Sequence, residues 1–447
     1  MSAPETKCII PPRSEVNGCD CDEKLLDTFN NGDLHERLIA LLHRPYFRFF
    51  KVNLDRKCPF WNDYSDKCSI PDCAVKTCAA DELPISLRDL SVSNVQAQVA
   101  EACAQEEELS SVDYSMNADQ KAEIVKWEDL QDENFCLVDD EGASDCSYLD
   151  LSKNPERYTG YVGFSPNRIW RSIYEENCFK PSNGSPTFSL AQAMQYETCF
   201  EKKAFFRVIS GLHSSISIHL CALYLPPGPF GQWGPNLQEF LRRFDDSVTD
   251  GEGSDRLRNL YFTYSLLLRA LVKASPRLKN EKYSTGDVLE DETLRKDVQA
   301  FLDIIAVNPS KFDESKLFSG EPAQAHALKE EFRLHFRNIS RIMDCVGCQK
   351  CRLWGKLQTQ GIGTALKILF SDLQTIDDLK LLRSEIVSLW QAFGRISSSL
   401  VKLAQFRSMI QAGSARGGGD MGSNVPLFQS KPSVMLLSTP SAKKMEL

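Results

Sequence analysis

The chain has 447 residues, which is long enough for a large buried core and for as many as about three domains. Its formal net charge of −9 argues against nucleic-acid binding, because such binding depends on cationic contacts to phosphate. Sixteen cysteines are more than a chain of this size uses in a reducing cytosol, so they indicate an oxidising compartment on the secretory route.

The N-terminal region, residues 1–54, is predicted to be a short arm stapled through its cysteines and followed by a first helix. The first residues, MSAPETKCII, lack the basic start and apolar core of a signal peptide, so we expect a leader to have been removed or omitted. No run of about 18 apolar residues occurs, so we expect no membrane span. The last residues, Lys444-Met445-Glu446-Leu447, resemble an endoplasmic reticulum retrieval signal with a different second residue.

Residues 55–105 are predicted to be a cysteine-bearing loop. Between residues 55 and 85, four cysteines are separated by prolines and other turn formers, with little helical periodicity. A loop of this length in a compact domain is usually functional.

Helical periodicity dominates from about residue 165 onward. Apolar residues recur every three or four positions in 204–225, 256–271, 328–346 and 386–410. Four such faces packed together form a bundle core, which can hold a cofactor between facing helices. Strand-like alternation is scarce, so we predict an all-α fold: a single helical domain with a four-helix-bundle core and long disulfide-stapled loops.

We place the helical core in residues 106–412, in one domain with the preceding segments. After Gly413 the run SARGGGDMGSN has no periodicity, so residues 413–447 are predicted to be a flexible tail.

Residues 345–351 read CVGCQKC, and we predict that these three cysteines lie on one narrow arc of a helix. The Cα atoms of Cys348 and Cys351 would be about 5 Å apart, a separation that a disulfide tolerates, so the pair suits a two-electron switch. A structural disulfide and a metal site are the alternatives. An iron–sulfur cluster normally needs a fourth nearby thiolate, and none follows Cys351, so we predict no metal.

Electrons from such a pair must pass to another disulfide, a flavin or a metal. No dinucleotide fingerprint is present, because Gly361-Ile362-Gly363 is followed by Leu366 where a third glycine would stand. A P-loop is also absent. Any flavin would therefore be held by side chains of the bundle. Asn338-Ile339-Ser340 is a glycosylation sequon, consistent with the secretory route.

Several longer motifs carry a family resemblance that covers about residues 8–411. They are KCPFWND at 57–63, DCAVKTC at 72–78, NPERYTGY at 154–161, IYEENCFKP at 173–181, ISGLHSSI at 209–216, GEG at 251–253, RLRNLYF at 256–262 and HFRNISRIMDCVGCQKCRLWGKLQTQG at 335–361. With these motifs the chain resembles the endoplasmic oxidoreductins, flavin-dependent sulfhydryl oxidases that oxidise protein disulfide isomerase.

The resemblance implies an enzyme with bound FAD inside the bundle. Cys348 and Cys351 would be the active-site pair, with Cys351 facing the flavin, and Cys68 and Cys73 would be a shuttle pair that receives electrons from the isomerase. Electrons would reach molecular oxygen and give hydrogen peroxide. The implied partners are protein disulfide isomerase and related thioredoxin-fold proteins. The implied location is the endoplasmic reticulum lumen, peripheral on the membrane face.

The resemblance also implies an off state. In that state Cys68 pairs with Cys103 and Cys73 pairs with Cys78, which removes the shuttle until reducing conditions return. The plain alternative for Cys78 is a structural cysteine.

The resemblance implies seven flavin contacts whose chemistry suits a dinucleotide. A tryptophan stacks on a flat ring, arginines neutralise a diphosphate, and a histidine bonds the ring or its ribityl edge. By periodicity alone, the histidine and the tryptophan would instead be core residues. The seven are Arg157, Thr159, Trp170, Ser210, His213, Arg243 and Arg256.

Structural disulfides are implied as well, pairing Cys58 with Cys345, Cys178 with Cys199, and Cys8 with Cys21. The chain departs from the family at a position near Ile10, where a cysteine partner for Cys19 would stand. As a hypothesis, Cys136 and Cys146 form an added bond, and Cys221 is a buried thiol. The rival function is a disulfide-stapled secretory binding protein without redox turnover; a metal-binding regulator is a third.

Overall fold

The computed structural model describes residues 22–60, 73–88, 135–136, 146–156, 164–181, 190–195, 197, 199–225, 232–308, 312–371 and 379–415. The chain divides into two compact units, Met1–Phe406 and Arg407–Leu447. In the second unit the description covers residues 407–415, which continue a helix. The first unit holds every site discussed below.

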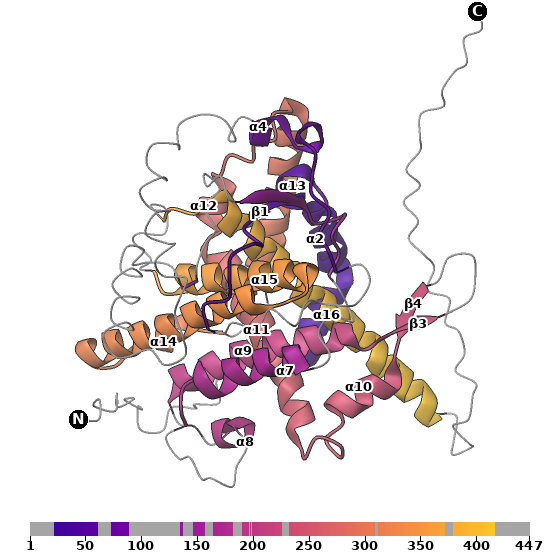
Figure 1. Ribbon diagram of the computed structural model, residues 1–447, viewed down its shortest axis with the longest axis vertical. Coiled ribbons are helices and arrows are strands. Elements are labelled where there is room, and N and C mark those ends of the chain that lie inside the picture. Colours follow the sequence, from indigo (N-terminus) through magenta and orange to yellow (C-terminus); the bar gives the residue numbers. More distant parts are fainter. Residues whose placement is uncertain are drawn as a thin grey trace, which may run out of the picture. The chain divides into compact units, whose positions relative to one another are not determined.

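The first unit is built mainly of helices, so the predicted all-α class is confirmed (Figure 1). Its N-terminal helices are α1 (Glu23–Phe29), α2 (His35–Leu42), α3 (Pro45–Arg48) and α4 (Ile85–Arg88). The central and C-terminal ones are α7 (Phe164–Arg171), α8 (Leu190–Gln195), α9 (Phe200–Leu220), α10 (Leu237–Phe244), α11 (Glu252–Lys273), α12 (Ser275–Lys279), α13 (Val288–Ala306), α14 (Pro322–Ile342), α15 (Gln349–Leu369) and α16 (Arg383–Ala415). Short 3-10 or π-helical turns are η1 (Asn30–Leu34), η2 (Ala80–Glu82), η5 (Ser172–Glu176), η6 (Glu314–Lys316) and η7 (Met343–Cys345).

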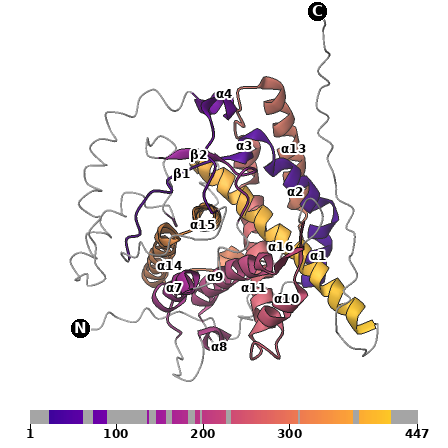
Figure 2. The same ribbon diagram turned by 45° about the vertical axis from the view of Figure 1, so that its right-hand side comes forward.

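Helices α9, α11, α15 and α16 form the core. α11 packs along α9 and against α15. Two glycines allow the closest approaches. A Cβ on Gly211 of α9 would lie 2.3 Å from the Asn259 carbonyl oxygen of α11, and one on Gly361 of α15 would lie 2.2 Å from the Ser388 carbonyl oxygen of α16. Figure 2 shows α15 almost along its axis, with α14 beside it.

Buried polar contacts close the ring of four helices between α9 and α16. Ser215 and Ser399 share a hydrogen bond of 2.7 Å, and Ser399 also bonds His219 Nε2 over 3.0 Å. Three of these helices, α9, α11 and α16, bury the apolar stripes that were predicted at 204–225, 256–271 and 386–410. The fourth predicted stripe, at 328–346, lies on α14 and η7, and α15 takes the fourth place in the core instead.

Two small antiparallel sheets accompany the helices. β1 (Phe49–Val52) pairs with β2 (Ser147–Asp150), and β3 (Ala222–Leu225) pairs with β4 (Gln232–Pro235). The helix predicted over 204–225 is too long, because α9 ends at Leu220 and residues 222–225 form β3. None of the helices in the described ranges combines the length and the apolarity that a bilayer crossing requires.

Candidate redox and cofactor site

The cysteine pair of the CVGCQKC motif lies at the N-terminus of α15. Cys348 is the N-cap residue, and its sulfur accepts a hydrogen bond from the Cys351 backbone N–H over 3.5 Å. Cys348 is 3% exposed and Cys351 is 1% exposed. A helix N-terminus stabilises an anion placed there, so this position favours the thiolate that thiol exchange requires.

The prediction that all three cysteines share one helix is wrong. Cys345 ends η7, Val346 is extended with φ −77° and ψ 116°, and α15 begins only at Gln349. A β-branched residue followed by Gly347 favours such a break. Cys348 and Cys351 are therefore related as an N-cap residue and the third helical residue.

Cys73, far away in sequence, packs against this pair. Cys73, Cys348 and Cys351 form one buried cluster, with Val346 packed on it. The backbone supports the contact, because the Lys350 N–H donates to the Cys73 carbonyl oxygen over 3.0 Å. Cys73 is disulfide-bonded.

The rest of the segment that carries Cys73 is also held in place. The Val75 N–H donates to Gln349 Oε1 over 3.2 Å, and Thr77 makes a β-bridge to Leu149 of β2. The structure thus brings together one of the two predicted shuttle cysteines and the predicted active-site pair. Cys68 and Cys103 lie outside the described residues.

The loop before the shuttle segment, by which we mean the described residues 73–78, is anchored beside α15. Cys58 and Cys345 form a disulfide, as the resemblance implies. Lys356 Nζ donates to the Asn53 carbonyl oxygen over 2.8 Å and forms a buried ion pair with Asp344, also over 2.8 Å. These contacts fix η7 to the first turns of α15.

Cys178 and Cys199 do not pair with each other, which corrects the implied staple. Cys178 is a free, buried thiol, and burial raises its pKa to about 12. Cys199 is disulfide-bonded. The two residues are carried by different elements: Cys178 follows η5, and Cys199 is the N-cap of α9.

The hypothetical bond between Cys136 and Cys146 is not formed either. Cys136 lies against α15, where its thiol donates to the Gln360 carbonyl oxygen over 3.9 Å. Cys221 is a buried thiol, as predicted, and burial raises its pKa to about 12. The predicted pair Cys8–Cys21, and Cys19 with it, lie outside the described residues.

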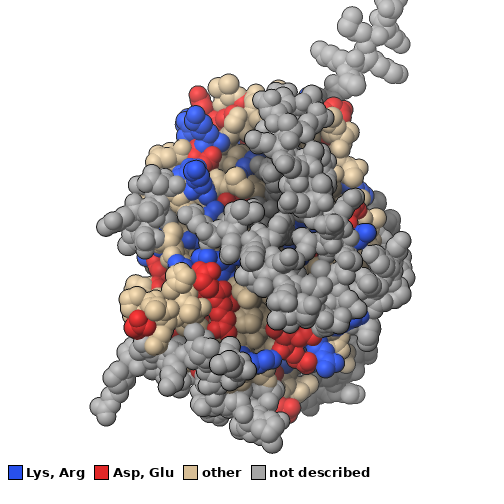
Figure 3. Space-filling model, turned by 60° about the vertical axis from the view of Figure 1, so that its left-hand side comes forward, with Lys and Arg blue, Asp and Glu red and all other residues tan. Residues whose placement is uncertain are grey.

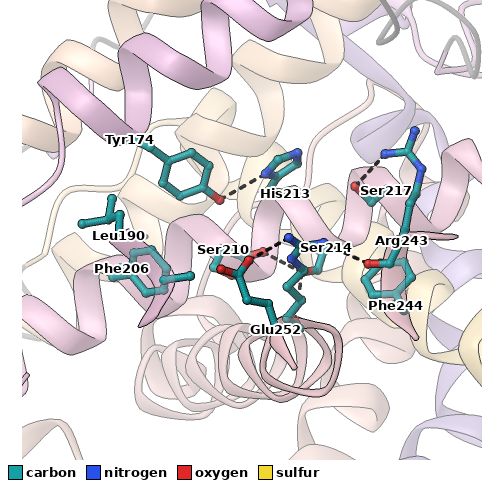
Figure 4. A pocket seen from close by; sticks show the side chains of 12 residues that line it. Tyr174, Leu190, Phe206, Ser210, His213, Ser214, Ser217, Arg243, Phe244 and Glu252 are labelled. Carbon is teal, nitrogen blue, oxygen red and sulfur yellow. Dashed lines mark hydrogen bonds and ion pairs between the residues drawn. The ribbon is translucent and has the colours of Figure 1, made fainter. Parts of the chain in front are cut away.

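A cavity of about 320 Å³ opens between α9, α10, α11 and η5 (Figure 4). At one end Tyr174 and Phe206 present aromatic rings. At the other end Arg243 donates to Ser217 Oγ over 3.4 Å. Four of the seven predicted flavin contacts line this cavity: Ser210, His213, Arg243 and Arg256.

The aromatic side of the cavity is organised around His213. The Trp170 ring stacks on the imidazole with 3.7 Å between ring centroids and an interplanar angle of 10°. Tyr174 Oη lies 3.1 Å from His213 Nδ1. Burial, followed by the charges of Arg256 and Arg243, lowers the pKa of His213 to about 3. A neutral imidazole accepts the Tyr174 hydroxyl at Nδ1 and keeps an N–H at Nε2 for another partner.

Carboxylates orient the two arginines. Arg243 Nε donates to Glu239 over 2.6 Å, and Arg256 Nη2 donates to Glu252 over 2.8 Å. Arg256 also donates to the Arg243 carbonyl oxygen over 3.0 Å, which links α11 to α10. Two prearranged guanidinium groups beside one cavity suit a phosphate-bearing ligand.

The remaining predicted residues fall into two groups. Trp170 contacts His213, whereas Arg157 and Thr159 lie outside the described residues. Sequence reasoning missed Tyr174, Ser217 and Glu252 as cavity residues. Tyr174 lies four positions after Trp170, and that spacing indicates a shared helical face.

The predicted glycosylation sequon is carried by α14, where Asn338 is half-buried and Ser340 is 8% exposed. Its modification stays a prediction.

Comparison with known proteins shows the family of the chain. The family model described as Endoplasmic Reticulum Oxidoreductin 1 (ERO1) matches residues 33–403. The human ERO1-like protein alpha is 46% identical over 439 residues, covering 91% of this chain and 94% of the relative. The Caenorhabditis elegans endoplasmic reticulum oxidoreductin-1 is 44% identical over 434 residues, covering 91% and 90%.

Solved structures of Ero1p also match the fold of this chain. The structure titled "Structure of Ero1p, Source of Disulfide Bonds for Oxidative Protein Folding in the Cell" matches with a TM-score of 0.57 and 29% identity, covering 89% of this chain and 100% of that one. A double cysteine-to-alanine mutant of Saccharomyces cerevisiae Ero1p matches with a TM-score of 0.57 and 30% identity, covering 88% and 99%. From the family match, the relatives and the shared fold, the chain belongs to the endoplasmic reticulum oxidoreductin 1 family of oxidoreductases.

Proposed function

We propose that this protein is a thiol oxidase of the endoplasmic reticulum lumen that drives oxidative folding. Its electron donors are the dithiols of protein disulfide isomerase and related thioredoxin-fold proteins, and its acceptor is molecular oxygen. The observation that carries the proposal is the buried cluster of Cys73 with Cys348 and Cys351, because thiol–disulfide exchange needs a shuttle sulfur in contact with the active-site pair.

Two exchanges move one electron pair inward. A thiolate of the partner attacks the disulfide of Cys68 and Cys73, and the partner's second thiol then resolves the mixed disulfide. The partner leaves oxidised and the shuttle pair becomes a dithiol. When Cys348 and Cys351 are joined as a disulfide, a shuttle thiolate next attacks the sulfur of Cys348, and Cys351 leaves as the thiolate, stabilised by the helix N-terminus. The second shuttle thiolate then displaces Cys348, so the shuttle disulfide forms again and the active-site pair becomes a dithiol.

The residues around the cavity fit FAD. His213, Trp170 and Tyr174 offer ring surfaces for flat groups, and Arg243 and Arg256 offer cations for the diphosphate. Because Trp170 and His213 stack directly, a flat ring would lie on an outer face of this pair and not between its members.

A second observation supports the fit near the cysteines. Gln358 is 1% exposed and lies about two turns after Cys351 on α15, and its Oε1 has no hydrogen-bond partner among the described residues. An orphaned buried amide oxygen is suited to a polar ligand edge. Bound FAD would supply an acceptor for the electron pair of a dithiol and a donor to oxygen, which gives hydrogen peroxide.

The chain's own residues would hold that cofactor and control access to it. We assign the diphosphate to Arg243 and Arg256, together with Arg157, and assign Ser210 and Thr159 to hydrogen bonds. The pairs Cys68–Cys103 and Cys73–Cys78 would form the off state. The free, half-buried thiol of Cys78 supports this assignment.

One spectrum tests the proposal. Purified protein should be yellow, bleach when a dithiol is added without air, and regain its colour when air enters. Colourless protein, or a chromophore that never bleaches, would contradict the proposal and favour a binding protein without turnover.

A matched pair of variants locates the cofactor. Arg256→Gln should lower the flavin retained per protein by about tenfold, because charge-assisted bonds to a phosphate are lost. Arg258→Gln removes an equal charge from a side chain that is 62% exposed and bound to Asp255. It should retain flavin as the parent does. Equal retention by both variants would place the diphosphate elsewhere.

A further inference from the structure

The Asn154 side chain makes two hydrogen bonds to the backbone of Lys76 in the shuttle segment. The Lys76 N–H donates to Asn154 Oδ1 over 2.6 Å, and Asn154 Nδ2 donates back to the Lys76 carbonyl oxygen over 2.9 Å. Asn154 is 0% exposed. A buried side-chain amide that satisfies both the donor and the acceptor of one peptide residue acts like a neighbouring strand.

The same asparagine is tied to the helix that carries the active-site pair. The indole N–H of Trp354 on α15 donates to the Asn154 carbonyl oxygen over 2.7 Å. Asn154 Nδ2 also donates to the Asp150 carbonyl oxygen at the end of β2 over 3.0 Å. Asn154 therefore connects α15, β2 and the shuttle segment.

On either side of the Asn154 contact with Lys76, which we call the clamp, the two cysteines of this segment lie against different parts of the fold. On one side Cys73 packs on Cys348 and Cys351, and on the other side Cys78 lies beside Asp150. Five extended residue steps span up to about 16 Å. A disulfide needs Cα atoms within about 7 Å of each other.

Cys78 is also poorly activated where it lies. Burial raises the pKa of its thiol and outweighs a hydrogen bond with the Asp150 backbone, which lowers it; the charges of the Asp150 and Glu82 carboxylates add to the rise. Less of the attacking thiolate is therefore present while the segment stays clamped.

We propose that Asn154 is a positioning residue that keeps Cys73 docked on the active-site pair and so opposes its pairing with Cys78. This inference rests on the proposed function, because it concerns the switching of that same site. When the clamp opens, the Cys78 thiolate attacks Cys73 and displaces the sulfur to which Cys73 is bonded. One S–S bond forms and one breaks, the thiol proton of Cys78 passes to the departing sulfur, and no external oxidant is needed.

The test measures the disulfide partner of Cys73. Full-length protein is equilibrated in glutathione buffers, quenched with acid and alkylated, and the ratio of the Cys73–Cys78 peptide to other Cys73 disulfides is measured by mass spectrometry. Asn154→Ala should raise this ratio about tenfold, since two buried hydrogen bonds oppose the switch. Asn154→Asp keeps the acceptor for the Lys76 N–H and should raise the ratio less.

Two further variants make the result decisive. Asn30→Ala removes an equally buried asparagine, which donates to the Ser397 carbonyl oxygen and accepts from the Ser397 hydroxyl, away from the shuttle segment. It should leave the ratio unchanged. If Asn154→Ala does not fold, Gln349→Ala removes the acceptor for the Val75 N–H and should raise the ratio about threefold.

The inference would be overturned if the ratio in the parent were the same as in Asn154→Ala or, should that variant not fold, in Gln349→Ala. An equal rise of the ratio in Asn30→Ala would also overturn it. The peptide ratio is measured after equilibration with glutathione and does not depend on turnover of a flavin. Failure of the oxidase proposal, seen in the spectrum, is therefore distinct from failure of the clamp.

Discussion

His213 shows how burial sets the protonation of one residue at the candidate site. Its pKa is lowered to about 3 by burial and by Arg256 and Arg243, whereas an unfolded histidine titrates near 6.5. Between these two pH values His213 is protonated in the unfolded chain and neutral in the folded protein. Stability is therefore lost as the pH falls from about 6.5 toward 3.

We predict that His213→Gln lowers the acid sensitivity of the apoprotein. Between pH 7.5 and pH 5 the His213 contribution is up to about 2 kcal/mol, and the variant should lack it. Urea unfolding at both pH values measures this difference. His43→Gln, at an exposed histidine, is the control and should keep the parent's difference. An unchanged pH dependence in His213→Gln would contradict the stated cause.

For single residues, the sequence indicated the candidate cofactor contacts but not the side chains that hydrogen-bond to them. Ser210, His213, Arg243 and Arg256 were expected near a cofactor, and they do line one cavity. Their supporting groups were not expected: Glu252 orients Arg256, and Asn154 holds Lys76. Such contacts join separate elements, so local spacing could not reveal them.

At the scale of elements, periodicity predicted the existence of the helices better than their ends. The apolar stripe of α14 continues into the CVGCQKC motif, so one helix was expected where the structure has α14, η7 and α15. The break depends on a tertiary contact, because Cys345 is tied to Cys58. The short pair β3–β4 was also missed, since its strands have only four residues each.

The close crossing of α15 and α16 at Gly361 gives a prediction for this scale. Gly361→Ala would place a Cβ 2.2 Å from the Ser388 carbonyl oxygen and 2.5 Å from Ala392 Cβ. The helices must then separate, at a cost of about 1–3 kcal/mol of unfolding free energy. Thermal unfolding should show a lower midpoint. Gly413→Ala meets nothing within 4 Å and should not lower it.

At the scale of the whole molecule, the chain has more acidic than basic residues, 61 against 52. On the face in Figure 3, acidic and basic side chains are interspersed over the described surface. The net charge of −9 opposes the binding of a polyanion such as nucleic acid. The many cysteines act differently from one another: Cys58–Cys345 is a cross-link, whereas Cys178 and Cys221 are buried thiols.

The disulfide of Cys58 and Cys345 should be a major global stabiliser, because it joins residues 287 positions apart. Closing so long a loop restricts the unfolded chain, and the chain-entropy relation gives an upper limit of about 5.7 kcal/mol. We predict that replacing both cysteines by alanine lowers the free energy of unfolding by about 3–5 kcal/mol in urea titrations. Cys221→Ala, at a buried thiol outside any disulfide, should cost about 1 kcal/mol. Equal losses in the two proteins would mean that buried volume, and not the cross-link, provides the stability.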